Sequence, residues 1–231
     1  MSPTKLQICI YNTIKKNKLL TKISLKILCF FNFNKYKIKG LRNTIIDNGV
    51  YLKNIKFDII GDDNHIYFFG ESIIENFTIY IRGSKHNLFV GKRCVLQGGS
   101  FWFEDNNCII KIGENTTFEN AHLAVTENEK SIEIGNYCML AYDIEIRTGD
   151  SHSIIDLGTN NRINYAQNVK ICDHVWIGAG VKILKGVSIG ENSIIGTGSI
   201  VTKSIPENCV AAGIPAKIIR KNVTWERKRI D

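Results

Sequence analysis

Apolar residues recur at every sixth position between Ile171 and Pro206. Read in sixes, the stretch is ICDHVW, IGAGVK, ILKGVS, IGENSI, IGTGSI and VTKSIP, and every block begins with Ile or Val. The fifth residue of each block is β-branched or small: Val175, Val181, Val187, Ser193, Ser199 and Ile205. A period of six matches neither the turn of a helix nor the alternation of a hairpin. It predicts short strands joined by tight corners, that is, a parallel β-helix with one large and one small inward residue per strand.

A looser form of the same repeat precedes this stretch. Hexads begin at Phe69, Val90, Ile112 and Ile134, and the last three starts lie 22 residues apart. Because three hexads make one coil, we interpret each interval as an 18-residue coil with four extra residues at a corner, as in GGSFWFEDNN and VTENEK. We therefore expect an all-β solenoid over residues 44–219. Residues 1–43 and the tail 220–231 are expected to cap its ends.

The six-residue pattern is interrupted between residues 147 and 169. The segment RTGDSHSIIDLGTNNRINYAQNV is rich in Gly, Asn and Asp and contains His152. A long loop that leaves a rigid solenoid adds nothing to its core, so a functional role is favoured. We expect this segment to be an active-site loop.

Positive charge is concentrated at the start of the chain. The net charge is +8, and residues 1–42 contain ten Lys or Arg and no Asp or Glu, so the remainder is slightly acidic. Leu20, Ile23 and Ile27 share one face of a predicted helix, but the apolar run is too short to span a bilayer and has no signal-peptide cleavage site. Three interpretations stay open: a helix packed on the domain or a neighbouring subunit, a basic segment in peripheral contact with the inner membrane surface, or disorder.

Composition argues against several other classes. The repeat region lacks the interleaved aromatic and basic residues that bind nucleic acid. The seven cysteines are scattered without a CxxC pair, and no two histidines have the spacing of metal ligands. We therefore expect no nucleic acid, no metal, reduced thiols and a cytoplasmic protein.

His152, at the start of the loop, is a candidate general base. Imidazole accepts a proton from a hydroxyl or an amine near neutral pH, and a positioned base accelerates a reaction by about 10²–10⁴-fold. The alternative is a surface histidine without a function. No GxSxG nucleophile motif is present and Cys172 and His174 are interpreted as packing residues, so direct transfer is favoured over a covalent intermediate. Trp102, in SFWFED, stays open as a sugar-stacking surface, a cap or a contact between subunits.

Several segments resemble the hexapeptide-repeat acyltransferases: the hexads, RTGDSHSIID, DHVWIGAGVKILKGVSIG, GTGSIVTKSIP and AAGIPAKIIR. Within that family they resemble sugar O-acetyltransferases of capsule, lipopolysaccharide and exopolysaccharide biosynthesis, including those that act on polysialic acid. The resemblance is specific over about residues 134–220 and weak before residue 90. It implies a left-handed parallel β-helix, a homotrimer with its sites between subunits, and acetyl-CoA as cosubstrate.

The resemblance assigns roles to individual residues. His152 matches the catalytic base that removes the acceptor proton, and Trp176 matches an aromatic residue that lines the active site opposite the histidine. Asp150 is a candidate from its position alone: it lies two residues before His152 and could orient the imidazole or bind a sugar hydroxyl. The remaining matches lie along the expected acetyl-CoA groove: Ala179 and Thr197 at the pantetheine arm, Thr202 and Lys203 further along, and Lys217 and Arg220 at the phosphates. For each of these the alternative is an ordinary surface residue.

The expected activity is transfer of an acetyl group from acetyl-CoA to a hydroxyl of a surface glycan or of its lipid- or nucleotide-linked precursor. One alternative is N-acetylation of an amino sugar nucleotide, because the same base serves an amine. Another is a β-helix without catalytic activity that acts as a scaffold. The joint presence of His152, the loop and the groove residues argues against a scaffold.

Overall fold

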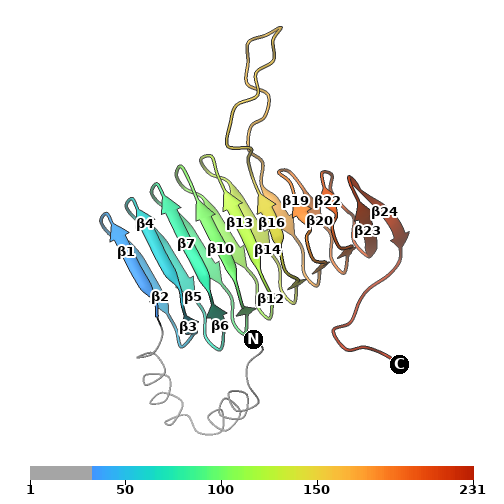
Figure 1. The fold of residues 1–231 in the computed structure, drawn as a ribbon, viewed down its shortest axis with the longest axis horizontal. Helices are drawn as coiled ribbons and strands as arrows, with labels where there is room; N and C mark the ends of the chain where they lie inside the picture. The colour runs from blue at the N-terminus through green and yellow to red at the C-terminus, as the bar shows by residue number, and fades with distance from the viewer. Residues whose placement is uncertain (1–32) are drawn as a thin grey trace.

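The computed structural model describes residues 33–231, which wind into a three-sided parallel β-solenoid (Figure 1). Each coil contributes one strand to each of three sheets, here called sheets 1, 2 and 3. The prediction of a parallel β-helix is confirmed. The last two strands, β23 and β24, pair antiparallel and close one end of sheet 3.

Sheet 1 consists of β1 (Lys35–Lys39), β4 (Lys56–Ile60), β7 (Phe77–Arg82), β10 (Gly99–Phe103), β13 (Ala121–Val125), β16 (Ile144–Arg147), β19 (Lys182–Ile183) and β22 (Ile200–Val201). Sheet 2 consists of β2 (Thr44–Asp47), β5 (His65–Phe68), β8 (Asn87–Val90), β11 (Ile109–Ile112), β14 (Ser131–Ile134), β17 (Val169–Ile171) and β20 (Ser188–Ile189). Sheet 3 consists of β3 (Tyr51–Lys53), β6 (Ile73–Glu75), β9 (Val95–Leu96), β12 (Thr117–Phe118), β15 (Met139–Leu140), β18 (Trp176–Ile177), β21 (Ile194–Ile195), β23 (Cys209–Gly213) and β24 (Ala216–Lys221).

The first and fifth residues of the hexads fill the interior, as their spacing predicts. Ile177 and Ile183 are fully buried, and so are the small residues Ser193 and Ser199. The buried hydroxyls stay hydrogen-bonded: Ser193 donates to the backbone oxygen of Pro206 (2.8 Å) and Ser199 to that of Gly196 (2.6 Å). At these two positions the backbone of a corner accepts the hydrogen bond of the buried hydroxyl.

The extra residues of the early coils lie mainly in sheet 1, so the prediction of corner insertions is wrong for GGSFWFEDNN. Half of that segment is strand β10, whose Gly99 pairs with Ala121, 22 residues later. Phe101 and Phe103 point inward and are buried, while Trp102 between them points outward. Long strands with this alternation pack large aromatic residues inside the coil. The number of residues between paired positions of successive coils drops to 18 where the strands are short, as in β19 and β22, which have only two residues each.

Strand pairing begins at Lys35, earlier than the residue 44 at which the sequence predicts the start of the coil. At the interruption β16 ends at Arg147 and β17 begins at Val169, so residues 148–168 form the loop, which projects far from the coil (Figure 1). The predicted N-terminal helix and its proposed membrane contact fall almost wholly in residues 1–32, outside the described residues. Within residues 33–231, no helix has the length and apolar character needed to cross a bilayer.

Three buried thiols give a direct test of this core. Burial raises the pKa of Cys94 and of Cys108 to about 11 and that of Cys138 to about 12. Because the thiolate is the reactive form, these cysteines are expected to stay unmodified by iodoacetamide at about pH 8 in the native chain. Peptide mapping should find them modified only after unfolding. Native labelling of any of the three at the unfolded rate would contradict the packing.

Candidate active site

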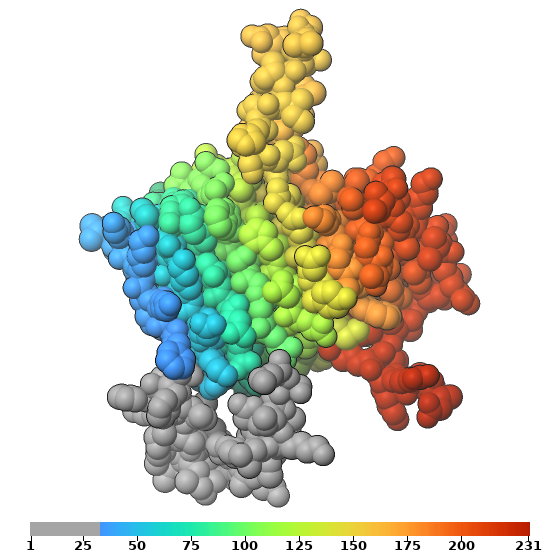
Figure 2. Space-filling view, in the orientation of Figure 1, coloured from blue at the N-terminus to red at the C-terminus, as the bar shows by residue number. Residues whose placement is uncertain are grey.

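Asn164 joins the two ends of the loop that carries His152. Its buried side chain donates hydrogen bonds to Asp150 Oδ2 (2.9 Å) and to the backbone oxygen of His152 (2.7 Å), and it accepts one from the backbone N–H of Ile154 (2.7 Å). These contacts fix the backbone on both sides of His152. The loop to which His152 belongs stands out from the solenoid as an arm (Figure 2). Sequence reasoning missed Asn164, because nothing distinguishes it from the other asparagines of this loop.

Asp150 ties the loop to the solenoid. Lys185, in the corner after β19, donates to the Asp150 carboxylate and to the backbone oxygen of Asn164 (2.9 Å). The hydrogen bond from Lys185 is the main cause that lowers the pKa of Asp150 below its ordinary value, so this carboxylate is ionised at neutral pH. The backbone N–H of His152 donates to the backbone oxygen of Asp150 (2.8 Å). Asp150 therefore holds the segment next to the imidazole in place.

Trp176 lies on the outward face of sheet 3, in β18, with 39% of its surface exposed. The loop that carries His152 leaves the corner between sheets 1 and 2, because it connects β16 to β17. In the triangular cross-section of the coil, that corner lies opposite sheet 3. One chain therefore does not bring His152 and Trp176 together, and a site that contains both needs a second copy.

The C-terminal tail packs beside Trp176. Trp225 is 6% exposed, stacks on His174 with ring centroids 4.4 Å apart, and lies 6.0 Å from the Trp176 ring. Its indole N–H donates to the backbone oxygen of His174 (2.8 Å). Further along, Arg227 donates to Thr117 Oγ1 (3.0 Å). The tail thus packs against one side of Trp176, the candidate active-site tryptophan. The polar sequence of the tail, KNVTWERKRID, does not predict this contact.

We expect Trp225→Ala to release this tail without unfolding the coil. Removing the buried indole costs docking free energy of about 2 kcal/mol, so trypsin should cleave within the tail at least about tenfold faster. Trp225→Phe, which keeps a ring against His174, should behave nearly like the wild type. Equal cleavage rates for Trp225→Ala and the wild type would show that the stacking contact does not hold the tail.

The residues assigned to acetyl-CoA fall into two groups. Ala179 and Thr197 lie in successive coils at the corner between sheets 3 and 1, where the backbone N–H of Gly198 donates to the oxygen of Ala179 (2.8 Å). Lys217 and Arg220 are exposed on β24, at the end of sheet 3. These four residues therefore lie on or next to the sheet that carries Trp176.

Thr202 and Lys203 belong to the other group. They follow β22 and are exposed at the corner between sheets 1 and 2, the same corner from which the loop with His152 departs. The candidate site residues are thus divided between two parts of the solenoid surface. Neighbouring copies can unite the two groups, whereas a single chain cannot.

Metal ligation has no support in the part of the chain that the structure describes. Among residues 33–231, no group of three or more His, Cys, Asp and Glu side chains is placed to hold a metal ion.

The chain is similar to known proteins over most of its length. Residues 168–203 match the family "Bacterial transferase hexapeptide (six repeats)". The polysialic acid O-acetyltransferase of Neisseria meningitidis is 37% identical over 195 residues, which cover 84% of this chain and 90% of that protein. The corresponding protein of Escherichia coli O1:K1 is 40% identical over 116 residues, which span 50% of this chain and only 38% of that protein.

A solved structure agrees with these relatives. The crystal structure of the polySia-specific acetyltransferase NeuO superposes with a TM-score of 0.78 at 32% identity, covering 84% of this chain and 89% of NeuO. Fold, repeat and sequence identity all point the same way. The chain belongs to the hexapeptide-repeat family of O-acetyltransferases and is an acyltransferase.

Proposed function

We propose that this protein transfers the acetyl group of acetyl-CoA to a hydroxyl of a cell-surface glycan or its precursor. The observation that carries the proposal is the likeness, over nearly the whole of both chains, to a protein named polysialic acid O-acetyltransferase. The hydrogen bonds from Asn164 to Asp150 and to the backbone of His152 also support the proposal, because a residue that acts as a catalytic base must be held in place. The free thiols among the described cysteines suit a reducing compartment, so the proposal places the enzyme in the cytoplasm.

The reaction is a direct transfer. The imidazole of His152 accepts the proton of the sugar hydroxyl while that oxygen attacks the thioester carbonyl carbon. The new C–O bond forms, the C–S bond breaks, and the departing CoA thiolate takes the proton back from the imidazolium. The indole of Trp176, supplied by the neighbouring chain, lines the opposite side of the reacting groups.

The division of the candidate residues and two apolar surfaces support an assembly of several copies, which we propose to be a homotrimer. The arm exposes Ile154, Leu157, Ile163 and Tyr165. The outward row of sheet 3 is largely apolar and partly exposed, and it includes Ile73, Val95, Met139, Ile194 and Val210. Rows of this kind on a solvent face mark contacts between proteins, and a second copy that covers them also completes the site.

The acceptor is tested with purified protein, acetyl-CoA, a polysialic acid oligomer and a galactoside. Release of the CoA thiol that depends on a saccharide, with an ester in the product that hydroxylamine removes, supports O-acetylation. An amide that resists hydroxylamine would contradict it. No saccharide-dependent thiol release with any acceptor of a wider glycan panel would contradict the proposal as a whole.

Lys217 and Arg220 are expected to bind the phosphates of CoA. Replacing both with alanine removes two cations from β24, and charge-assisted contacts of this kind are each worth about 1.5–3 kcal/mol, so CoA affinity should fall at least about tenfold. The matched control replaces Lys111 and Lys170, two exposed lysines on the outward face of sheet 2. Calorimetric titration with CoA compares the two double variants. Equal affinities would contradict the groove assignment.

A further inference from the structure

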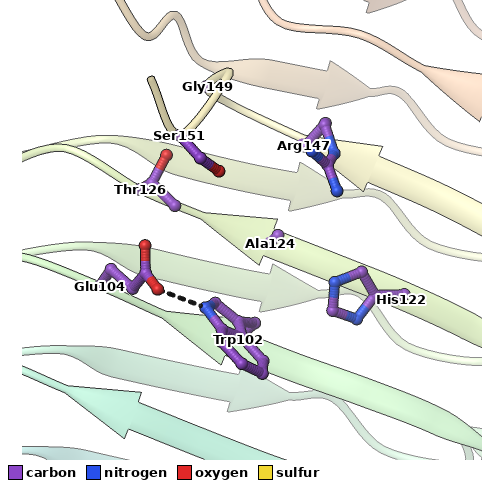
Figure 3. Close-up of a pocket in the computed structure, with 8 residues that line it drawn as sticks. All are labelled: Trp102, Glu104, His122, Ala124, Thr126, Arg147, Gly149 and Ser151. Carbon is purple, nitrogen blue, oxygen red and sulfur yellow. Dashed lines mark hydrogen bonds between the residues drawn. The ribbon is translucent and has the colours of Figure 1, made fainter. Parts of the chain in front are cut away.

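A hollow of about 210 Å³ lies on the outward face of sheet 1, beside the base of the loop (Figure 3). It opens between Trp102 of β10 and Arg147 of β16, and Ser151, the residue before His152, forms part of its wall. None of its lining residues has a role in the mechanism above. The hollow is therefore a separate feature that adjoins the proposed base.

A small residue in a row of large ones creates this hollow. Tyr80, Trp102, Ala124 and Arg147 occupy the same outward position in four successive coils. Tyr80 and Trp102 stack with ring centroids 3.7 Å apart, and the Arg82 guanidinium lies 3.9 Å from the centre of the Tyr80 ring. At Ala124 the row of large side chains is interrupted, so one face of the Trp102 indole is left uncovered over a gap about two strand spacings, or ~10 Å, wide. A flat ring fits that vacancy.

The Trp102 ring is fixed as a platform. Its indole N–H donates to Glu104 Oε1 (3.0 Å), and Figure 3 shows the Glu104 carboxylate facing the same hollow. Stacking on Tyr80 holds the other face of the indole. A platform that is already ordered loses little side-chain entropy when a ligand binds to it.

Two polar atoms of the residues around the hollow lack partners. Three buried side-chain nitrogen or oxygen atoms in the described residues have no hydrogen-bond partner, and two of them, Thr126 Oγ1 and Arg147 Nε, belong to residues that line this hollow. Leaving such an atom unsatisfied costs about 1–3 kcal/mol, so each needs an explanation. Both atoms are fully buried, so a small shift of these two side chains would bring them within reach of ligand hydroxyl groups above the indole.

We infer that this hollow is a subsite for one pyranose ring of the acceptor glycan, stacked on Trp102 in the place left by Ala124, with ring hydroxyls bonded to Thr126, Arg147 and Glu104. The inference rests on the proposed function and names the surface that holds its acceptor. A convergence of an aromatic platform with a carboxylate, a guanidinium and a hydroxyl is the chemistry of a hydroxyl-rich ligand. Of the roles left open for Trp102 by the sequence, sugar stacking is the one that explains the uncovered indole and the unpaired polar atoms.

The test fills the hollow instead of removing its parts. Ala124→Leu places a side chain in the vacancy, and Thr126→Val replaces the hydroxyl with a methyl group of similar shape. The control, Thr78→Leu, changes an outward residue of β7 on the same sheet that does not line the hollow. Binding of a polysialic acid oligomer and of a galactoside to the full-length chain is measured by saturation-transfer NMR and titration, without acetyl-CoA.

We expect the wild type to bind at least one saccharide, Ala124→Leu to weaken that binding at least about tenfold, and Thr126→Val to weaken it about three- to tenfold. Thr78→Leu should match the wild type, and in turnover Ala124→Leu should raise the KM for the saccharide but not for acetyl-CoA. Equal binding by Ala124→Leu and the wild type, or no binding of either saccharide by the wild type, overturns the subsite. If the wild type binds a saccharide but transfers no acetyl group, and Ala124→Leu abolishes the binding, the result supports the subsite and contradicts the proposed function.

Discussion

His152→Ala should lower the rate of acetyl transfer at least about 100-fold, because the acceptor hydroxyl would lose the base that takes its proton. The change should appear in kcat, since the imidazole acts on the reacting atoms and is not needed to hold either substrate. Affinity for CoA and for the saccharide should stay within about twofold of the wild type. The rate is measured by thiol release at saturating concentrations of both substrates.

The structure supplies a control for this substitution. His152 is exposed and lies outside the core, so the thermal midpoint of His152→Ala should equal that of the wild type. His65→Ala removes a histidine from the outward face of sheet 2, away from the loop, and should leave turnover unchanged. A His152→Ala enzyme with a near-normal rate would remove this residue as the base.

Co-assembly of two inactive variants should restore activity. Trp176→Ala removes the indole on sheet 3, and His152→Ala removes the imidazole at the opposite corner. If each site takes its imidazole from one chain and its indole from the next, every mixed trimer has one site in three with both groups, and therefore about a third of the wild-type rate. The two chains are co-expressed with different tags, and assemblies that carry both tags are purified and assayed.

A matched pair decides whether such recovery reflects sharing of the site. His152→Ala co-expressed with the double variant His152→Ala/Trp176→Ala provides no imidazole anywhere, so this mixture should stay inactive. If the first mixture is active and the second is not, the site lies between chains. If the first mixture is no more active than its separate components, the idea of a site shared by neighbouring copies fails.

The sequence was sufficient to predict the coil because each inward position depends on its own hexad. Ile177 and Ile183 are buried in the structure for the reason their spacing suggests, and the break at residue 147 marks the loop correctly. The interpretation of GGSFWFEDNN as a corner insertion was wrong, because the extra residues of a longer coil can extend a strand as well as enlarge a corner. The alternation of Phe101, Trp102 and Phe103 was the signal for a strand.

Other features depend on contacts between residues far apart in the chain. Trp225 donates to a backbone oxygen 51 residues away, and Lys185 reaches across 35 residues to Asp150. No local pattern encodes either contact. The separation of His152 from Trp176 is likewise a consequence of which sheet each strand joins, which becomes apparent only once the coils are counted in three dimensions.

The measurement that tests the central claim most directly uses acetyl-CoA with a labelled acetyl group, the wild-type chain and a polysialic acid oligomer or another surface glycan. The account predicts that label appears in the saccharide as an ester that hydroxylamine releases, and that His152→Ala abolishes this transfer. Label that never enters a saccharide, or that enters equally well with His152→Ala, would contradict it.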